Sequence, residues 1–384
     1  MKAIFLRRSF LFLVSLLFLF ALLLGGCLKK EPIRIGFVAD LTGKQAELGV
    51  QERNGVQLAV DNLNASGGIA GRPIELLIQD DLGTGDGARA AIHQLLQANV
   101  AAIIGHATSA QTTLGLQLTD PAKIVLLSPT ASTPDLSGKS PYFFRVYPTF
   151  LDSARGFASY VYQDHALKKI AILADSDNAA YAFTYRDVFS DKYTSLGGSV
   201  VKSISYASSK QPDFAPLLKE LRQGEPDGLL LVTSDIDAAL IAQRARLMGW
   251  RVLLFASAWA QTEILLHNGG MAVEGMEIEQ AYALDNENQA FSAFKQQYQA
   301  RFGRAPSFGA SFGYEAASVL ANALKKTGGQ REGLRQALLD TKDFPGLLDT
   351  ISFSANGDVV RPFYLSTIRN GKFVILATLS QAKQ

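Results

Sequence analysis

Cysteine is almost absent from this sequence, which has only Cys27 among its 384 residues. A single cysteine excludes an internal disulfide and any zinc or redox site of the CxxC type. An excess of charge is absent as well, because 37 Lys and Arg stand against 35 Asp and Glu, for a formal net charge of +2. This balance gives no reason to expect nucleic acid as a partner.

Fingerprints of nucleotide-dependent and metal-dependent enzymes are also missing. No GxGxxG follows the first predicted strand, and no GxxxxGK(S/T) occurs. His106 lies shortly before Ser109, but the sequence places no acid to orient this histidine as a base. The four histidines form no HxxxH or HExxH pair; they are His93, His106, His165 and His267. We therefore expect no enzyme, no metal site and no cofactor.

What is present at the start of the chain is an export signal. Three basic residues precede an apolar run over residues 10–24, and no acidic residue occurs before Glu31. This order is typical of a secretory signal, and the run is shorter than the roughly 20 residues of a membrane span. Arg7-Arg8 also resembles part of a twin-arginine signal, although the very apolar core fits the general export route better.

The end of this signal, Leu24-Gly25-Gly26-Cys27, resembles a bacterial lipobox, with Gly25 where Ala or Ser is commoner. The resemblance predicts a signal peptide over 1–26, lipidation of Cys27 and a tether over 27–32. Removing the three basic residues of the signal leaves 34 basic against 35 acidic residues. Two or more lipid chains give stable anchoring. We therefore expect an exported protein anchored to a membrane, facing the periplasm or, in a single-membrane bacterium, the cell exterior.

The remaining chain alternates apolar strands with helices. Apolar residues make up 48 % of the sequence, which excludes a disordered chain. The length of 384 residues predicts two or three domains. Continuous apolar strands between helices are typical of parallel sheets covered on both faces. The rhythm runs to about residue 130 and restarts after 150, which predicts an α/β fold of two doubly wound lobes. The predicted strands are 33–38, 74–78, 100–104, 124–127, 169–174, 199–206, 228–232 and 252–256, followed by short strands near 349–353, 363–369 and 373–378.

Two neighbouring strands end in small, hydroxyl-rich segments. Gly105-His106-Ala107-Thr108-Ser109 follows the third strand, and a segment from Ser128 to Pro134 follows the fourth. Ligands of open parallel sheets sit beyond the carboxyl ends of the strands. A helix N-terminus with a Ser or Thr side chain binds anions, so a carboxylate could be held without Arg or Lys. Ordinary helix capping by Ser109 is the alternative.

Several motifs resemble the branched-chain amino acid-binding proteins, which are type I periplasmic solute receptors of ABC importers. The motifs occur in the family's order over residues 33 to 376. They are Ile35-Gly36-Phe37 with Asp40-Leu41-Thr42-Gly43, the turn Asn64-Ala65-Ser66-Gly67-Gly68-Ile69-Ala70-Gly71-Arg72-Pro73, Asp80-Asp81, Gly105 through Ser109, Ser128-Pro129-Thr130-Ala131-Ser132, Gly275-Met276 and Gly313-Tyr314-Glu315-Ala316.

This resemblance implies a two-lobed fold that closes on a small-molecule solute and delivers it to a membrane permease. It places three crossovers near residues 147–150, 280–285 and 358–362. Lobe 1 is then 33–148 with 283–358, and lobe 2 is 149–282 with 359–384. We expect a monomer. The alternative is a ligand-sensing receptor of the same fold that signals to a membrane partner, and a nucleotide-cofactor enzyme is disfavoured because the phosphate fingerprint is missing.

The resemblance also implies which residues bind the solute. A carboxylate would meet lobe 1 at the two hydroxyl-rich strand ends, and lobe 2 would add aromatic and polar groups. The implied residues are Leu48, Ser109, Thr130 (through its backbone), Ala131, Ser132, Tyr181, Ser234, Asp235 and Trp259. Tyr181 could instead be an exposed tyrosine at a helix start, and Trp259 could be core packing.

One departure from the family pattern concerns the solute's amine. Amino acid-binding members often carry an acidic residue where this sequence has Ala258. A buried ammonium without a partner is costly. Either Asp235 supplies the charge, or the solute is not an α-amino acid. The sequence therefore predicts a small carboxylate-bearing solute, an amino acid or an aromatic or aliphatic acid or amide, and leaves the amine open.

Overall fold

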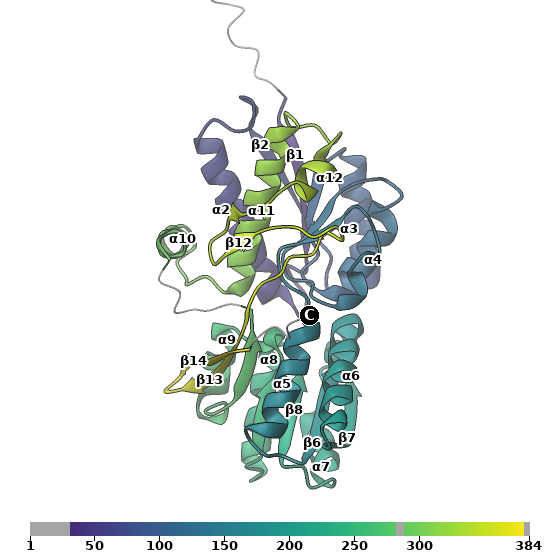
Figure 1. Cartoon of the computed structure of the whole chain (residues 1–384), viewed down its shortest axis with the longest axis vertical. Helices are drawn as coiled ribbons and strands as arrows, with labels where there is room; N and C mark the ends of the chain where they lie inside the picture. The colour runs from purple at the N-terminus through teal and green to yellow at the C-terminus, as the bar shows by residue number, and fades with distance from the viewer. Residues whose placement is uncertain (1–30, 282–287, 380–384) are drawn as a thin grey trace, which may run out of the picture.

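Two α/β lobes, each built on its own sheet, lie one above the other (Figure 1). The computed structural model describes residues 31–281 and 288–379. Signal peptide, Cys27, most of the tether and most of the predicted crossover near 280–285 lie outside the described residues. No helix in the described part of the chain has the length and apolar character needed to cross a membrane.

Lobe 1 is built on a parallel sheet of five strands in the order β2-β1-β3-β4-β5. The strands are β1 (Ile33–Ala39), β2 (Ile74–Asp80), β3 (Ala102–Gly105), β4 (Leu126–Ser128) and β5 (Phe143–Arg145). Successive side chains of a strand point to opposite faces. Phe37 accordingly packs with the cluster under α2 and α11, while Val38 packs with α3 and α4. Both faces are thus covered, which is why these strands are apolar throughout.

The helices of lobe 1 come from both ends of the chain. The helix α11 lies along α2, although the two are far apart in sequence (Figure 1). The helices are α2 (Ala46–Ala65), α3 (Gly85–Gln97), α4 (Ser109–Thr119), α10 (Gln289–Phe302), α11 (Phe308–Lys326) and α12 (Leu334–Leu339). A two-stranded ribbon of β11 (Phe344–Pro345) and β12 (Thr350–Ile351) completes this part.

Lobe 2 is built on a sheet of seven strands in the order β14-β13-β10-β9-β8-β6-β7. Parallel strands form most of it, and β13 and β14 are antiparallel additions at one edge. The strands are β6 (Lys169–Asp175), β7 (Ser199–Tyr206), β8 (Gly228–Val232), β9 (Leu253–Ala256), β10 (Glu277–Gln280), β13 (Phe363–Arg369) and β14 (Lys372–Leu379). The helices are α5 (Leu151–Gln163), α6 (Ala179–Ser195), α7 (Phe214–Arg222), α8 (Asp235–Leu247) and α9 (Glu263–Gly269).

The predicted fold class is confirmed, because the structure has two α/β lobes with largely parallel sheets. The chain passes from lobe 1 to lobe 2 between β5 and α5, returns after β10, and crosses again before β13. The exact lobe boundaries stay predictions.

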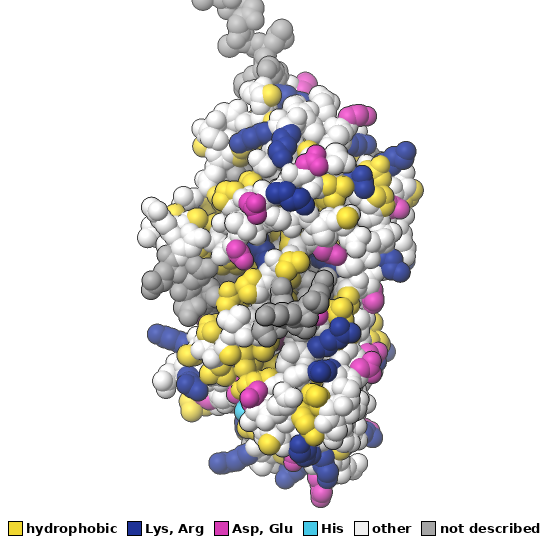
Figure 2. All heavy atoms as spheres, in the orientation of Figure 1, with side chains coloured by type: hydrophobic (Ala, Val, Ile, Leu, Met, Phe, Trp, Pro, Cys, Tyr) yellow, Lys and Arg dark blue, Asp and Glu magenta, His cyan; other side chains and the backbone are white. Residues whose placement is uncertain are grey.

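The prediction missed β5, α9, β10 and β11, and each of these is short. On the face shown in Figure 2, acidic and basic side chains are interspersed.

Candidate functional site

A small cavity lies between the two lobes, at the carboxyl ends of their strands. Its volume is about 30 Å³, which exceeds the roughly 10–15 Å³ that one water requires. Lobe 1 contributes mainly hydroxyl groups, and lobe 2 contributes an amide and aromatic rings. The lining residues are Leu48, Ala107, Thr108, Ser109, Thr130, Ser132, Tyr147, Asn178, Tyr181, Ala258, Trp259 and Phe308.

Ser109 is the first residue of α4, which begins directly at the cavity. Thr108 caps this helix, since its side chain accepts from the Gln111 N–H. The Ser109 hydroxyl oxygen accepts from the Thr133 N–H at 3.3 Å. Its own hydrogen therefore stays available for a bound acceptor, next to the positive end of the helix.

Thr130 lines the cavity, and its hydroxyl is shared between two protein groups. The Thr130 hydroxyl donates to the Ala107 carbonyl at 2.6 Å and is also bonded to the Glu52 carboxyl. Complete burial raises the pKa of Glu52 to about 8, against the lowering effect of the Thr130 bond. When Glu52 is protonated, its carboxyl can donate to the Thr130 hydroxyl, and the Thr130 hydroxyl can donate to the Ala107 carbonyl. Each of the two hydrogen bonds then has its own hydrogen.

Ser132 reaches the cavity, but Ala131 does not. The Ala131 N–H donates to the Ser128 hydroxyl at 3.0 Å, and its carbonyl accepts from Arg145. Ala131 is therefore not among the lining residues, and its contact with the solute stays a prediction. The fully buried Arg145 also donates to the Thr133 carbonyl at 2.7 Å. These bonds hold the loop in the shape that presents Ser132.

Four aromatic side chains, which we call the aromatic wall, form the apolar part of the lining: Tyr147, Tyr181, Trp259 and Phe308. The rings of Tyr181 and Trp259 meet edge to face, with centroids 5.6 Å apart. Tyr181 is only 5 % exposed, so it is not the exposed tyrosine that the sequence left open as an alternative. Trp259 packs against Tyr181 and also lines the cavity. The two roles that the sequence offers as alternatives, core packing and a place in the cavity wall, therefore both apply to Trp259.

Asn178 is a lining residue that the sequence reasoning missed. It lies at the end of the 3-10 turn Ser176–Asn178, just before α6 in lobe 2. Its side-chain oxygen accepts from the Ala110 N–H of α4 at 3.1 Å. Its position could have indicated a site residue, because Asn178 follows the end of β6 and ligands of open parallel sheets bind beyond the carboxyl ends of the strands.

Ser234 and Asp235 are buried in lobe 2 but are not among the residues that line the cavity. The Asp235 carboxylate accepts from the Ile236 N–H at 2.8 Å and from the Thr262 hydroxyl. Burial raises the pKa of Asp235 to about 6. Both oxygens are therefore engaged, and the structure does not bring this charge to the cavity. Ala258 does line it, and none of the described lining residues has an acidic or basic side chain.

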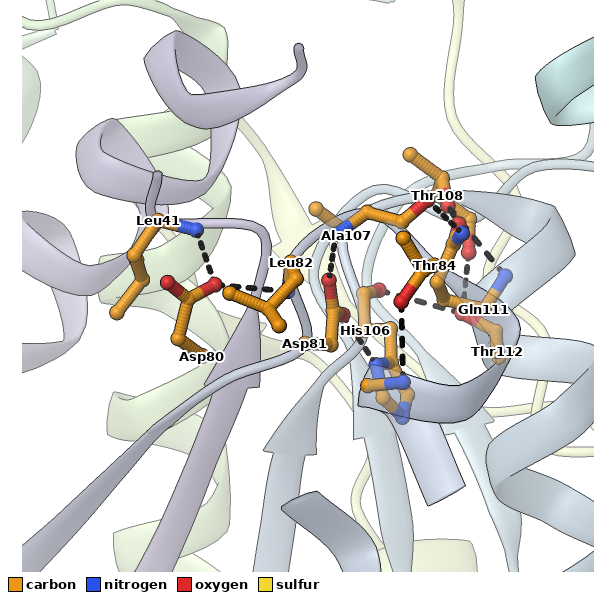
Figure 3. A network of polar contacts seen from close by, with 12 residues as sticks. Leu41, Asp80, Asp81, Leu82, Thr84, His106, Ala107, Thr108, Gln111 and Thr112 are labelled. Carbon is orange, nitrogen blue, oxygen red and sulfur yellow. Dashed lines mark hydrogen bonds and ion pairs between the residues drawn. The ribbon is translucent and has the colours of Figure 1, made fainter. Parts of the chain in front are cut away.

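An acid does orient His106, contrary to the expectation from the sequence. The Asp81 carboxylate lies 2.6 Å from His106 Nδ1, and both groups are buried (Figure 3). The other ring nitrogen faces the α4 backbone, since a Cβ on Gly115 would come within 2.7 Å of His106 Nε2. Ser109 bonds to Thr133 instead of His106. The pair therefore fixes the loop after β3 and does not form a nucleophile and its base.

Two other features resemble functional groups without acting as such. Asp40, Asp80 and Asp81 lie close enough to hold a metal ion. Asp80 instead accepts from the Leu41 and Leu82 N–H groups, as Figure 3 shows.

Residues 309–313 match GxSxG, a pattern that the sequence reasoning overlooked. Ser311 lies inside α11 and donates to the Ser307 carbonyl, so it is not an exposed nucleophile.

Comparison with known proteins places this arrangement among solute receptors. A family model described as periplasmic binding protein matches residues 32–372. The Leu/Ile/Val-binding protein BraC3 of Rhizobium johnstonii is 26 % identical over 368 residues, covering 90 % of this chain and 94 % of the relative. A branched-chain amino acid transporter substrate-binding protein of Streptococcus pneumoniae, solved with isoleucine, is 26 % identical with a TM-score of 0.83. The match covers 90 % of this chain and 99 % of that protein.

A second solved structure shares the fold at lower sequence identity. It is a solute-binding protein of an ABC transporter from R. palustris, in complex with benzoate. It is 22 % identical to this chain with a TM-score of 0.83, and the match covers 92 % of this chain and 97 % of that protein.

Proposed function

Because the chain belongs to the periplasmic binding protein family, we propose that it is the receptor of an ABC importer for a small carboxylate-bearing solute with an apolar group. Membership in this family makes it an extracytoplasmic solute-binding protein and not an enzyme. The observation that carries the proposal is the cavity between the lobes, whose lining combines hydroxyl-bearing residues of lobe 1, which we call the hydroxyl end, with the aromatic wall.

The hydroxyl end suits a carboxylate. Ser109, Thr130 and Ser132 line it, together with the start of α4. A carboxylate only accepts hydrogen bonds. The Ser109 and Ser132 hydroxyls and the N-terminus of α4 supply donors here, whereas the Thr130 hydroxyl donates to the Ala107 carbonyl. No basic side chain occurs among the lining residues that the structure describes, so these residues hold the anion through hydrogen bonds and the helix dipole.

The aromatic wall suits an apolar or aromatic group on the same solute. Aromatic side chains bury a large apolar area and stack on ring systems. Solved proteins of this fold hold isoleucine in one case and benzoate in another. Both solutes combine one carboxylate with one apolar group, which is the combination that this cavity offers.

Both lobes line the cavity, so a bound solute stabilises the closed arrangement. Further contacts join the lobes around it. Lys44 Nζ of lobe 1 lies 3.9 Å from Asp237 Oδ1 of lobe 2, and the Thr184 hydroxyl donates to Asp135 at 2.8 Å. We propose that opening breaks these contacts at hinges near 147–150, 280–285 and 358–362, and that the closed form is the one presented to the permease.

The proposal includes export and anchoring. Cleavage before Cys27 and lipidation of this residue would keep the receptor beside the permease in the membrane. Mass spectrometry of the N-terminal peptide tests this, because diacylglycerol and an acyl chain on Cys27 give a defined mass increase. An unmodified Cys27, or a retained residue 26, would contradict it.

The function is tested by native mass spectrometry and calorimetry. We expect the protein purified from its source to carry a small carboxylic acid, and the unliganded protein to bind that acid with a raised melting temperature. A panel of amino acids, aromatic acids, aliphatic acids and amides serves if nothing co-purifies. The absence of any melting shift across this panel would contradict the proposal.

A further inference from the structure

Several buried polar atoms without a hydrogen-bond partner lie together in lobe 2. They include both carboxylate oxygens of Glu279 and the hydroxyls of Tyr181, Tyr185 and Ser257. We call this group the Glu279 cluster. Each of these side chains is at most 5 % exposed. Buried polar groups in proteins are almost always hydrogen-bonded, so a cluster like this indicates a group that is supplied from outside.

The Glu279 cluster lies directly behind the cavity wall. The strand β10 pairs with β9 so that Ile278 stands opposite Ala256. Glu279 therefore stands beside the turn after β9, and the Ala258 N–H points toward its carboxylate. Ala258 and Tyr181 both line the cavity. The Ala258 side chain is a single methyl group, so little separates the cavity from Glu279 at this point.

Within residues 31–281 and 288–379, no cationic side chain acts on the pKa of Glu279. Its neighbours are Ser153 at the start of α5, Tyr185 and Tyr181 of α6, Tyr147 of the crossover and the Ala258 N–H. Burial raises the pKa of Glu279 to about 7, and the nearby Ser153 and Tyr185 hydroxyls and the Ala258 N–H oppose this rise without reaching hydrogen-bond geometry. A buried carboxylate without a positive partner is costly. A positively charged group on the solute would remove this cost.

We propose that Glu279 is the carboxylate partner of an ammonium group on the solute, reached past Ala258 and Tyr181. This inference rests on the proposed function and narrows it, since the solute is then an amino acid. The solute carboxylate lies at Ser109 and Ser132, its side chain lies on the aromatic wall, and its ammonium faces Glu279. The hydroxyls of Tyr181 and Tyr185 hold the ionised carboxylate in place.

The test compares matched solutes that differ only in the amine. Calorimetry measures leucine against 4-methylpentanoate and phenylalanine against 3-phenylpropanoate, on the wild type and on Glu279→Gln. We expect the wild type to prefer the amino acid of at least one pair by about 10-fold or more. In Glu279→Gln we expect this preference to fall at least 10-fold, with the affinity for the amine-free acid nearly unchanged.

Glu277→Gln is the matched control, because Glu277 lies on the same strand and contacts His165 at 2.8 Å, away from the cavity. This variant should keep the preference. If Glu279→Gln does not fold, the wild type is measured from pH 6 to pH 8. Affinity for the amino acid should then rise as Glu279 ionises, while affinity for the amine-free acid should not.

The outcomes separate this inference from the proposed function. Equal affinities within each pair, or a preference that Glu279→Gln leaves intact, overturn the role of Glu279 while carboxylate binding stands. A preference that does not change with pH in the wild type has the same meaning. If neither the amino acids nor the amine-free acids bind, the proposed function and this inference both fall.

Discussion

The Ala110 N–H of lobe 1 donates to the side-chain oxygen of Asn178 in lobe 2 at 3.1 Å. One lobe thus supplies an acceptor for the first turn of a helix in the other. The bond lies at the edge of the cavity, because Asn178 and Ser109 both line it. This bond can form only when the lobes are closed. It therefore links closure of the lobes to the N-terminal end of α4, where we propose that the solute carboxylate binds.

The first prediction concerns this bond between the lobes. Asn178→Ala should weaken solute binding roughly 3- to 10-fold, since a neutral hydrogen bond contributes about 1 kcal/mol. Calorimetry with the identified solute measures the change. Thr184→Ala is the control, because its bond to Asp135 also joins the lobes but is exposed. A loss in Thr184→Ala equal to that in Asn178→Ala would contradict a special role for Asn178.

The second prediction concerns the carboxylate end of the cavity. Ser109→Ala and Ser132→Ala should each weaken binding about 10-fold or more, because hydrogen bonds to charged groups contribute about 1.5–3 kcal/mol. Melting temperatures should change little. Ser318→Ala is the control, since Ser318 bonds within α11 to the Tyr314 carbonyl. Unchanged affinity in both cavity variants would contradict the assignment of the carboxylate.

Much of the fold could be predicted because its strands are apolar throughout. The strand β8, for example, reads Gly-Leu-Leu-Leu-Val and is buried along its whole length, as a strand covered on both faces must be. The strand β5 was missed because it has three residues, and one of them is the buried Arg145. A charged residue is rarely buried without partners, and these partners come from distant loops.

The lining residues that follow strand ends or match the family pattern could be predicted, including Leu48, Tyr181 and Trp259. Contacts that depend on how the lobes close could not. Ser109, Thr130 and Ser132 follow neighbouring strands of lobe 1 and do meet at the cavity. Asn178 could not be paired with Ala110 in advance, because the bond depends on how the two lobes close. The place of Asp235 was not predictable either, since Thr262, far along the chain, engages its carboxylate.

The third prediction uses the two tryptophans of the sequence. Trp259 lines the cavity, whereas Trp250 packs in the core of lobe 2. Solute binding should change the intrinsic fluorescence in the wild type and in Trp250→Phe, but not in Trp259→Phe. Trp259→Ala should also weaken binding of solutes with a large apolar group roughly 10-fold or more, because it removes buried apolar contact. A fluorescence response that depends on Trp250 would contradict this arrangement.

The fourth prediction concerns the dependence of stability on pH. The pKa of Glu52 is about 8 in the folded protein, against 4.5 for the ordinary group. The folded state therefore holds this proton more tightly than the unfolded state. The stabilisation from Glu52 is complete below about pH 4.5 and is lost as the pH rises toward 8.

We therefore expect the free energy of unfolding of the wild type to fall between pH 5 and pH 8, by at most about 1.4 kcal/mol per pH unit for this group. Glu52→Gln cannot ionise, so its stability should fall less over the same range, as measured by urea unfolding at each pH. The pKa of Glu279, raised to about 7, should leave part of the slope in this variant. The double variant with Glu279→Gln should show the smallest slope. A slope in Glu52→Gln as steep as that of the wild type would mean that Glu52 is already ionised in the folded protein, with a positive partner or water beside it.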